Sequence, residues 1–176
     1  MKTALMMGLA GAMLVARPPT LVTRLDPITI PAQTTTFTTK VDLAGARDRL
    51  LAVEAANAVV LDLDGIEAER SPAVYFEVYV HSADAPRGET VGNLTLFGTG
   101  IRDEAVGEFR PARVRLTVTP QLRDALRRSP SVALTFVAQG AGGVPAPRSA
   151  AAVDIRRPAI VIEPRGGGEP VQLRAR

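Results

Sequence analysis

Cysteine and tryptophan are absent from the 176-residue chain, and histidine occurs once, at His81. Without cysteine the chain can form no disulfide, no thiolate zinc site and no cysteine nucleophile. A single imidazole cannot supply the ligands of a histidine-based metal centre, so the sequence predicts no metal and no other cofactor. The motifs of zinc proteases, serine hydrolases, P-loops and dinucleotide-binding domains are missing as well. We therefore predict that the chain is not an enzyme.

Concentrated positive charge is also lacking. The formal net charge is +3, aromatic residues make up 4% of the chain, and acidic residues are interspersed with the arginines. Proteins that bind nucleic acids usually gather lysine and arginine on one face with aromatic residues beside them. The composition therefore argues against a nucleic-acid partner.

No apolar run is long enough to span a bilayer, which takes about 20 residues. Residues 1–16 consist of a lysine near the start and a mostly apolar run, which is similar to a short secretory signal. This start favours export to the periplasm or the extracellular space. The alternative is a cytoplasmic protein whose apolar segment docks on a partner.

The chain is expected to contain one folded domain. We assign residues 1–26 to a signal-like apolar segment and a proline-rich linker, and the linker composition continues to residue 31. Residues 27–164 are assigned to a β-sandwich domain and residues 165–176 to a flexible basic tail.

Alternation of apolar and polar residues is the main feature that is present. Between residues 57 and 97, three runs of β-branched and aromatic residues have a period of two and are separated by turn-forming residues. Strands with one apolar face must bury that face, and a second sheet is the usual solution. The sequence thus predicts an all-β fold, a two-sheet antiparallel β-sandwich. Further strands are expected at 33–43, 112–119, 131–139 and 150–162.

One or two short helices complete the predicted fold. Residues 44–56 are compatible with a short helix or an irregular crossover, and both remain open. Thr119 is expected to cap a helix whose first residue is Pro120, with Leu122 and Leu126 on one side. The segment 82–90 is expected to be an exposed loop on composition.

Few residues suggest chemistry. The acidic cluster of Asp62, Asp64, Glu67 and Glu69 is a candidate calcium site or acid–base pair, but we favour the solvent-facing side of a strand that runs into a turn. His81 ends its strand at a loop, where a surface or strand-end role is favoured over a ligand role. The remaining candidates are loop charges that form a possible interaction loop: Asp84, Arg87 and Glu89.

Three strand motifs follow one another along the chain. They are Leu61-x-Leu-x-Gly-Ile-Glu67, Tyr75-Phe-Glu-Val-Tyr-Val80 and Gly92-x-Leu-x-Leu-Phe-Gly98. In this order they resemble the C-terminal domain of tyrosinases and polyphenol oxidases, whose plant members carry a Lys-Phe-Asp-Val motif followed by Tyr-Val. The framework residues of these motifs are Gly65, Tyr75, Phe76, Glu77, Val78, Tyr79, Val80 and Phe97.

The resemblance implies a jelly-roll β-sandwich that packs over a dicopper catalytic domain. In that family the domain shields the substrate entrance until it is removed or displaced, and in some members an accessory protein or domain assists copper loading. This chain departs from the family in two respects: it lacks the catalytic domain with its six copper-binding histidines, and it lacks the Cys-x-x-Cys motif of some fungal members. No residue is carried over for the side chain that plugs the copper site.

Two functional hypotheses follow. The first is a non-catalytic domain that docks on a type-3 copper oxidase and shields it, regulates it or helps it mature. The alternative is an exported β-sandwich interaction module or a structural subunit of a larger assembly.

Overall fold

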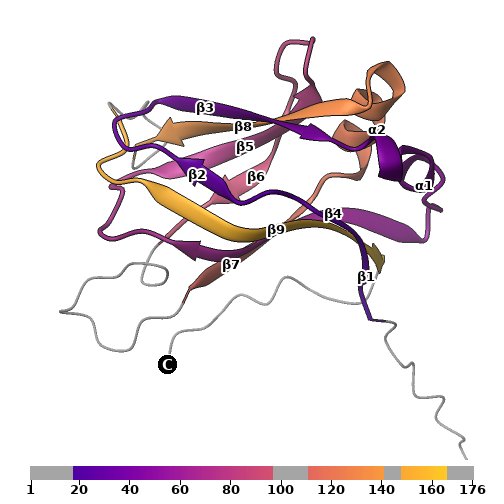
Figure 1. The fold of residues 1–176 in the computed structure, drawn as a ribbon, viewed down its shortest axis with the longest axis horizontal. Helices are drawn as coiled ribbons and strands as arrows, with labels where there is room; N and C mark the ends of the chain where they lie inside the picture. The colour runs from indigo at the N-terminus through magenta and orange to yellow at the C-terminus, as the bar shows by residue number, and fades with distance from the viewer. Residues whose placement is uncertain (1–17, 97–110, 141–147, 166–176) are drawn as a thin grey trace, which may run out of the picture.

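Buried side chains alternate with half-buried ones along β5 (Tyr75–Ser82), which pairs antiparallel with β8 (Ser131–Gln139), and Phe76, Val78 and Phe136 are fully buried. The structure, a computed structural model, describes residues 18–96, 111–140 and 148–165. Its strands form two antiparallel sheets that stack face to face (Figure 1). The predicted all-β sandwich is confirmed.

The order of the strands is that of a jelly roll. The first sheet has the order β1 (Thr20–Arg24), β9 (Val153–Pro164), β4 (Asn57–Glu67), β7 (Ala112–Thr117), and β2 (Ile28–Ile30) also pairs with β9. The second has the order β3 (Thr36–Asp42), β8, β5, β6 (Thr90–Leu94). The pairs β1–β9, β3–β8, β4–β7 and β5–β6 are nested along the chain, which is the pattern of a long hairpin rolled into two sheets.

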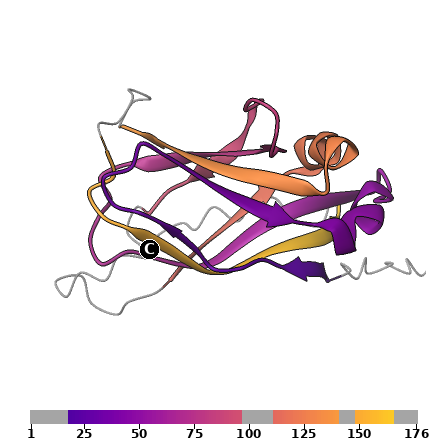
Figure 2. The ribbon, with the colours of Figure 1, turned by 45° about the horizontal axis from the view of Figure 1, so that its top comes forward.

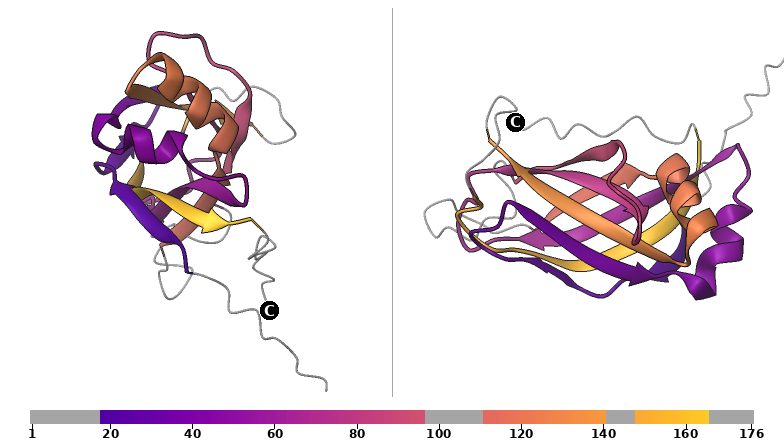
Figure 3. Two further views of the ribbon diagram at one scale, coloured as in Figure 1. Left: turned by 90° about the vertical axis from the view of Figure 1, so that its right-hand side faces the viewer. Right: turned by 90° about the horizontal axis from the view of Figure 1, so that it is seen from above.

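The core lies between the two sheets, and short helices close one end of it. These are helix α1 (Arg47–Leu51), which follows the 3-10 turn η1 (Ala44–Ala46), and helix α2 (Thr119–Arg128). Figures 1, 2 and 3 show both helices at this end of the sandwich from different directions. Leu50, Leu122 and Leu126 are buried beneath the helices. The open choice at 44–56 is thus settled in favour of a short helix.

The linker predicted for residues 18–31 is wrong. Strands β1 and β2 occupy most of this segment and pair with β9, so the sandwich begins near Thr20 and not at residue 27. Its prolines lie before, between and after the two strands, where a missing backbone donor costs no ladder hydrogen bond. Ile28 and Ile30 are buried in the core.

The capping role predicted for Thr119 is also wrong. Val118 is the N-cap residue of α2, and no side chain caps the helix. The Thr119 hydroxyl is buried and accepts a hydrogen bond from the backbone N–H of Val59 at 2.8 Å. Thr119 therefore joins the start of α2 to β4, while Leu122 and Leu126 face the core as expected.

Several predictions fall outside the described residues: the signal-like segment at 1–16, Phe97, and most of the tail at 165–176. In the ranges that are described, neither α1 nor α2 is long and apolar enough to cross a membrane.

Candidate functional site

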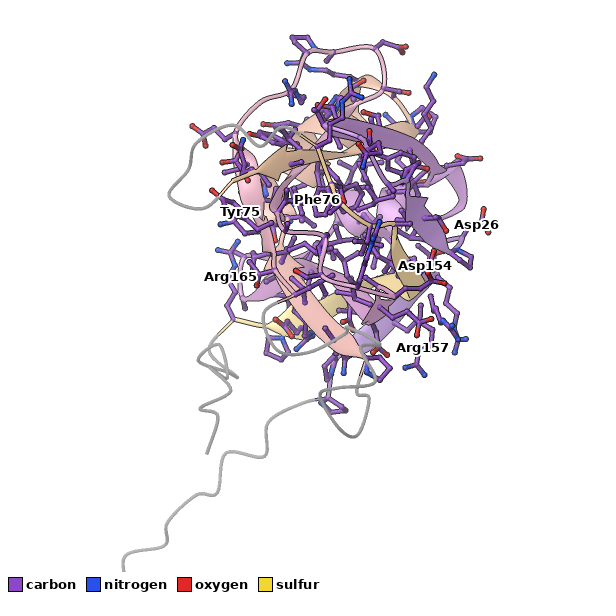
Figure 4. The ribbon with its side chains drawn as sticks, turned by 90° about the vertical axis from the view of Figure 1, so that its left-hand side faces the viewer. Asp26, Tyr75, Phe76, Asp154, Arg157 and Arg165 are labelled. Atoms are coloured by element: carbon purple, nitrogen blue, oxygen red, sulfur yellow. The ribbon has the colours of Figure 1, made fainter. Side chains whose placement is uncertain are left out.

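The second motif contributes to two different surfaces because its residues alternate between the faces of β5. Phe76, Val78 and Val80 point into the core, whereas Tyr75, Glu77 and Tyr79 lie on the outer face of the second sheet. Figure 4 shows Phe76 toward the interior and Tyr75 at the margin. Three of the six residues of the second motif are therefore core residues, and the other three lie on the accessible face.

Tyr79 is held at the centre of a small polar network on this outer face. Its hydroxyl donates to Glu77 Oε2 at 2.8 Å, and Gln139 Nε2 donates to the same oxygen at 3.0 Å. The Arg87 guanidinium lies 5.4 Å from the centre of the Tyr79 ring, which is the distance of a cation–π contact. Arg87, from the possible interaction loop, thus folds back onto the sheet.

The hydrogen bond to Glu77 raises the pKa of Tyr79 above its ordinary value of 10.0, helped by partial burial and by the charge of Glu77, and opposed by Arg87. The native state then holds its phenolic proton more tightly than the unfolded state. Stability is therefore expected to fall as the pH rises above 10 toward the native pKa, and to be unaffected by this group below that range. In a Tyr75→Phe variant, where Tyr79 is the only tyrosine, absorbance at 295 nm should titrate above pH 10.

Glu77→Gln in the same background should move this midpoint downward, because it removes the carboxylate charge. Two results would contradict a raised pKa caused by Glu77: a midpoint at or below pH 10 in the Tyr75→Phe variant, or a midpoint that Glu77→Gln leaves unchanged.

His81 fixes the loop of residues 83–89. Its Nδ1 lies 2.9 Å from the Ser82 carbonyl oxygen and 3.0 Å from that of Ala85, and Nε2 lies 3.0 Å from the Thr135 hydroxyl. Nδ1 faces only acceptors, so it carries a proton, and both ring nitrogens are engaged. His81 is a structural residue at the strand end.

An open hollow of about 300 Å³ separates this loop from α2. Glu89 lines it, together with Gln121, Asp124 and Arg128 from the helix. Asp84 is exposed on the loop. The loop charges thus do not converge: Arg87 covers Tyr79, Glu89 faces the hollow and Asp84 points to solvent.

The outer face of the first sheet carries a network of ion pairs between arginines and carboxylates. We call this surface the arginine face. Arg113 Nε and Nη2 donate to the two oxygens of Asp62 at 2.8 and 2.5 Å. Arg115 reaches across β4 to Glu163 of β9 at 2.6 Å. The other pairs are Arg157 with Asp64 at 3.3 Å and Arg156 with Glu67.

On the arginine face, the carboxylates lie close to the sheet and the guanidinium groups lie over them, toward solvent. The Asp62 and Glu67 side chains are only 8% and 5% exposed, whereas the arginines that bind them, Arg113 and Arg156, are 55% and 61% exposed. The hydrogen bond to Asp62 raises the pKa of Arg113, against a smaller effect of burial. A guanidinium has five N–H donors, so each arginine keeps donors for another molecule. The face therefore presents N–H groups outward.

A β-bulge at Gly65 makes this arrangement possible. The register of β4 shifts between Asp64 and Ile66, so Ile66 is buried in the core and Glu67 returns to the outer face. Gly65 has φ of +69°, and a Cβ there would lie 3.2 Å from the Arg156 Cβ. Glycine at position 65 of the first motif therefore allows β9 to pair closely with β4.

A groove of about 360 Å³ runs over β9 at the side of the arginine face next to β1. Arg24, Arg156 and Arg157 line it with Asp62 and Asp64. Figure 4 shows Arg157 at the outer margin of the molecule. The apolar lining of the groove consists of Leu21, Leu25, Pro158, Ala159 and Val161.

The structure corrects the interpretation of the acidic cluster as the solvent-facing side of a strand that runs into a turn. Asp62 and Glu67 are buried, Asp64 is paired, and only Glu69 is exposed. Within the described part of the chain, no group of three or more histidine, cysteine or acidic residues could hold a metal ion. Asp62, Asp64 and Glu67 therefore hold arginines in place.

Sequence reasoning did not select Arg113, Arg115 or Arg157 as site residues. One signal was available: Asp62-x-Asp64 and Arg113-x-Arg115 have the same two-residue spacing and opposite charge, as expected of cross-strand pairs. The pairing of β4 with β7 was needed to bring them together.

Fold and surfaces together define a jelly-roll β-sandwich domain with an arginine-lined outer face. No family model and no curated protein sequence matches the chain. Among solved structures, it is similar to latent apple tyrosinase, with 22% identity over 78% of this chain and 27% of that chain, and a TM-score of 0.43. It is also similar to recombinantly expressed latent aurone synthase, a polyphenol oxidase, with 14% identity over 84% of this chain and 30% of that chain, and a TM-score of 0.44.

Latent aurone synthase from its natural source gives a similar result, with 14% identity, 77% and 26% coverage, and a TM-score of 0.42. The similarity to plant polyphenol oxidases that the strand motifs indicated is thus found among structures too. The chain spans less than a third of the length of these proteins. A likeness of this extent does not assign their activity or partners to the chain.

Proposed function

We propose that this chain is a non-catalytic β-sandwich domain that docks on a type-3 copper oxidase and shields it, regulates it or helps it mature. The observation that carries the docking role is the arginine face: buried carboxylates orient exposed guanidinium groups on the outer face of the first sheet. Arginine is enriched at protein interfaces and among the residues that dominate their binding energy. The class of partner rests on the three ordered strand motifs.

The construction of this face favours directional recognition over simple solvation. Asp and Glu are rarely this buried unless paired, and the desolvation of a carboxylate costs stability that its ion pair only partly returns. An ordinary solvent-facing sheet would expose Asp62 and Glu67 to water. Here the buried acids hold Arg113 and Arg156 in fixed positions, which lowers the entropy that a partner must remove on binding.

The test combines the full chain with a tyrosinase catalytic domain that lacks its own C-terminal domain. Sedimentation velocity should show a one-to-one complex, and the oxidation of a bulky diphenol should slow as the complex forms. Arg157→Glu should weaken binding at least tenfold. This variant should still fold, because its partner Asp64 is 32% exposed and tolerates the loss of its ion pair.

Arg127→Glu on α2 is the matched control. It makes the same change of charge, and it also removes an ion pair with an exposed aspartate, Asp124. Binding should be unchanged in this variant. No complex with the parent chain, or equal losses in the two variants, would refute docking through the arginine face.

Export is part of the same proposal, since the signal-like residues 1–16 support a periplasmic or extracellular protein. N-terminal sequencing of the mature chain should find that this segment has been removed.

A further inference from the structure

We propose that the groove over β9 binds an extended acidic segment of the partner, in which an apolar side chain lies next to a carboxylate. This inference rests on the proposed function and adds to it the chemistry that the partner must present. It is carried by the charges of the groove, by its apolar lining and by its size.

The groove has an excess of cationic donors. Its two carboxylates are already engaged: Asp62 accepts both hydrogen bonds from Arg113, and Asp64 is paired with Arg157. Arg24 also lines the groove, but no carboxylate within the described ranges forms an ion pair with it. Arg24 is exposed, so its planar guanidinium can take a carboxylate through two parallel hydrogen bonds.

The apolar part of the groove lies beside this cation. Leu21 is 47% exposed, the one large hydrophobic side chain so exposed in the described part of the chain, and it lines the groove with Ala159 and Val161. A single exposed leucine is ordinary on a protein surface. Leu21 and Arg24, which forms no ion pair among the described residues, line the same concave site, so one ligand can make an apolar and a charged contact there.

Size limits the occupant to a short segment. The groove of about 360 Å³ is at the lower end of the range of roughly 300–1,000 Å³ that ligand pockets occupy. It has room for an apolar side chain with a neighbouring acidic one. Because the floor of the groove is a strand, β9, an extended segment can lie along it.

The test uses the full chain and the synthetic peptide acetyl-Asp-Leu-Glu-Leu-Asp-amide, followed by the arginine Nε–Hε signals in an NMR titration. The signals of Arg24 and Arg157 should shift, while that of Arg128 on α2 should not. Arg24→Gln should weaken peptide binding about tenfold, and the matched control Arg128→Gln should leave it unchanged. A peptide with serine in place of both leucines should also bind about tenfold more weakly.

Three results would overturn the inference: no shift at millimolar peptide, equal binding of a peptide with lysine in place of the acidic residues, or inorganic phosphate binding as tightly as the peptide. The last would identify a general anion site. If the oxidase binds and the peptide does not, the groove is wrong and the proposed function stands. If the peptide binds and the oxidase does not, the groove stands and the proposed partner is wrong.

Discussion

Replacing Phe76 with alanine is expected to lower the free energy of unfolding by about 3–5 kcal/mol, as large-to-small changes of buried aromatic residues do. Phe76 has no exposed surface, and it lies on β5 at the centre of the core between the two sheets. The loss combines the transfer energy of the ring with the cavity it leaves. Urea unfolding followed by circular dichroism measures it, and the unfolded fraction should rise at ambient temperature.

Tyr75→Ala is the control, because Tyr75 is the preceding residue on the opposite face of the same strand. It should cost less than about 1 kcal/mol, as surface changes usually do. Equal losses at the two positions would show that the outer face is as tightly packed as the core, contrary to the structure. The contrast also distinguishes the residues of the second motif that pack in the core from those that lie on the accessible face.

Gly92→Ala is expected to be the second large loss, about 2–6 kcal/mol as the sum of a backbone and a steric part. Gly92 has φ of +144°, a conformation that costs other residues of order 1–3 kcal/mol. A Cβ there would also lie 2.7 Å from the Leu116 Cδ2, and overpacking of a core costs roughly a further 1–3 kcal/mol. Thermal unfolding of the purified variant measures the sum.

A double variant separates the two causes. Leu116→Ala makes room for the added methyl group, so Gly92→Ala should cost less in that background, by the steric part alone. The residual loss is the backbone strain. If Gly92→Ala costs the same in both backgrounds, the contact with Leu116 carries none of the effect.

Local pattern was sufficient for most of the strands. The alternation in Tyr75–Ser82 and Ser131–Gln139 marked β5 and β8, and Pro120 with Leu122 and Leu126 marked α2. These signals are local, because a strand or an amphipathic helix shows its buried face within a few residues.

Other features depend on contacts between distant segments. The proline content of residues 18–31 concealed β1 and β2, whose strands are short enough to fit between the prolines. The arginine face could not be derived from Asp62 alone, because Arg113 reaches it only when β4 pairs with β7. The same holds for Thr119, whose partner Val59 is sixty residues away in sequence. Only the fold supplies these pairings.

The nested pairing of the strands also determines when the chain can fold during synthesis. Thr20 pairs with Ile162, and Thr36 pairs with Val137, so neither sheet can close until its late strand has left the ribosome. Folds dominated by such distant contacts form in roughly milliseconds to seconds. Until β8 emerges, the apolar strand β5 lacks this partner, and unpaired apolar strands of this kind are prone to aggregate.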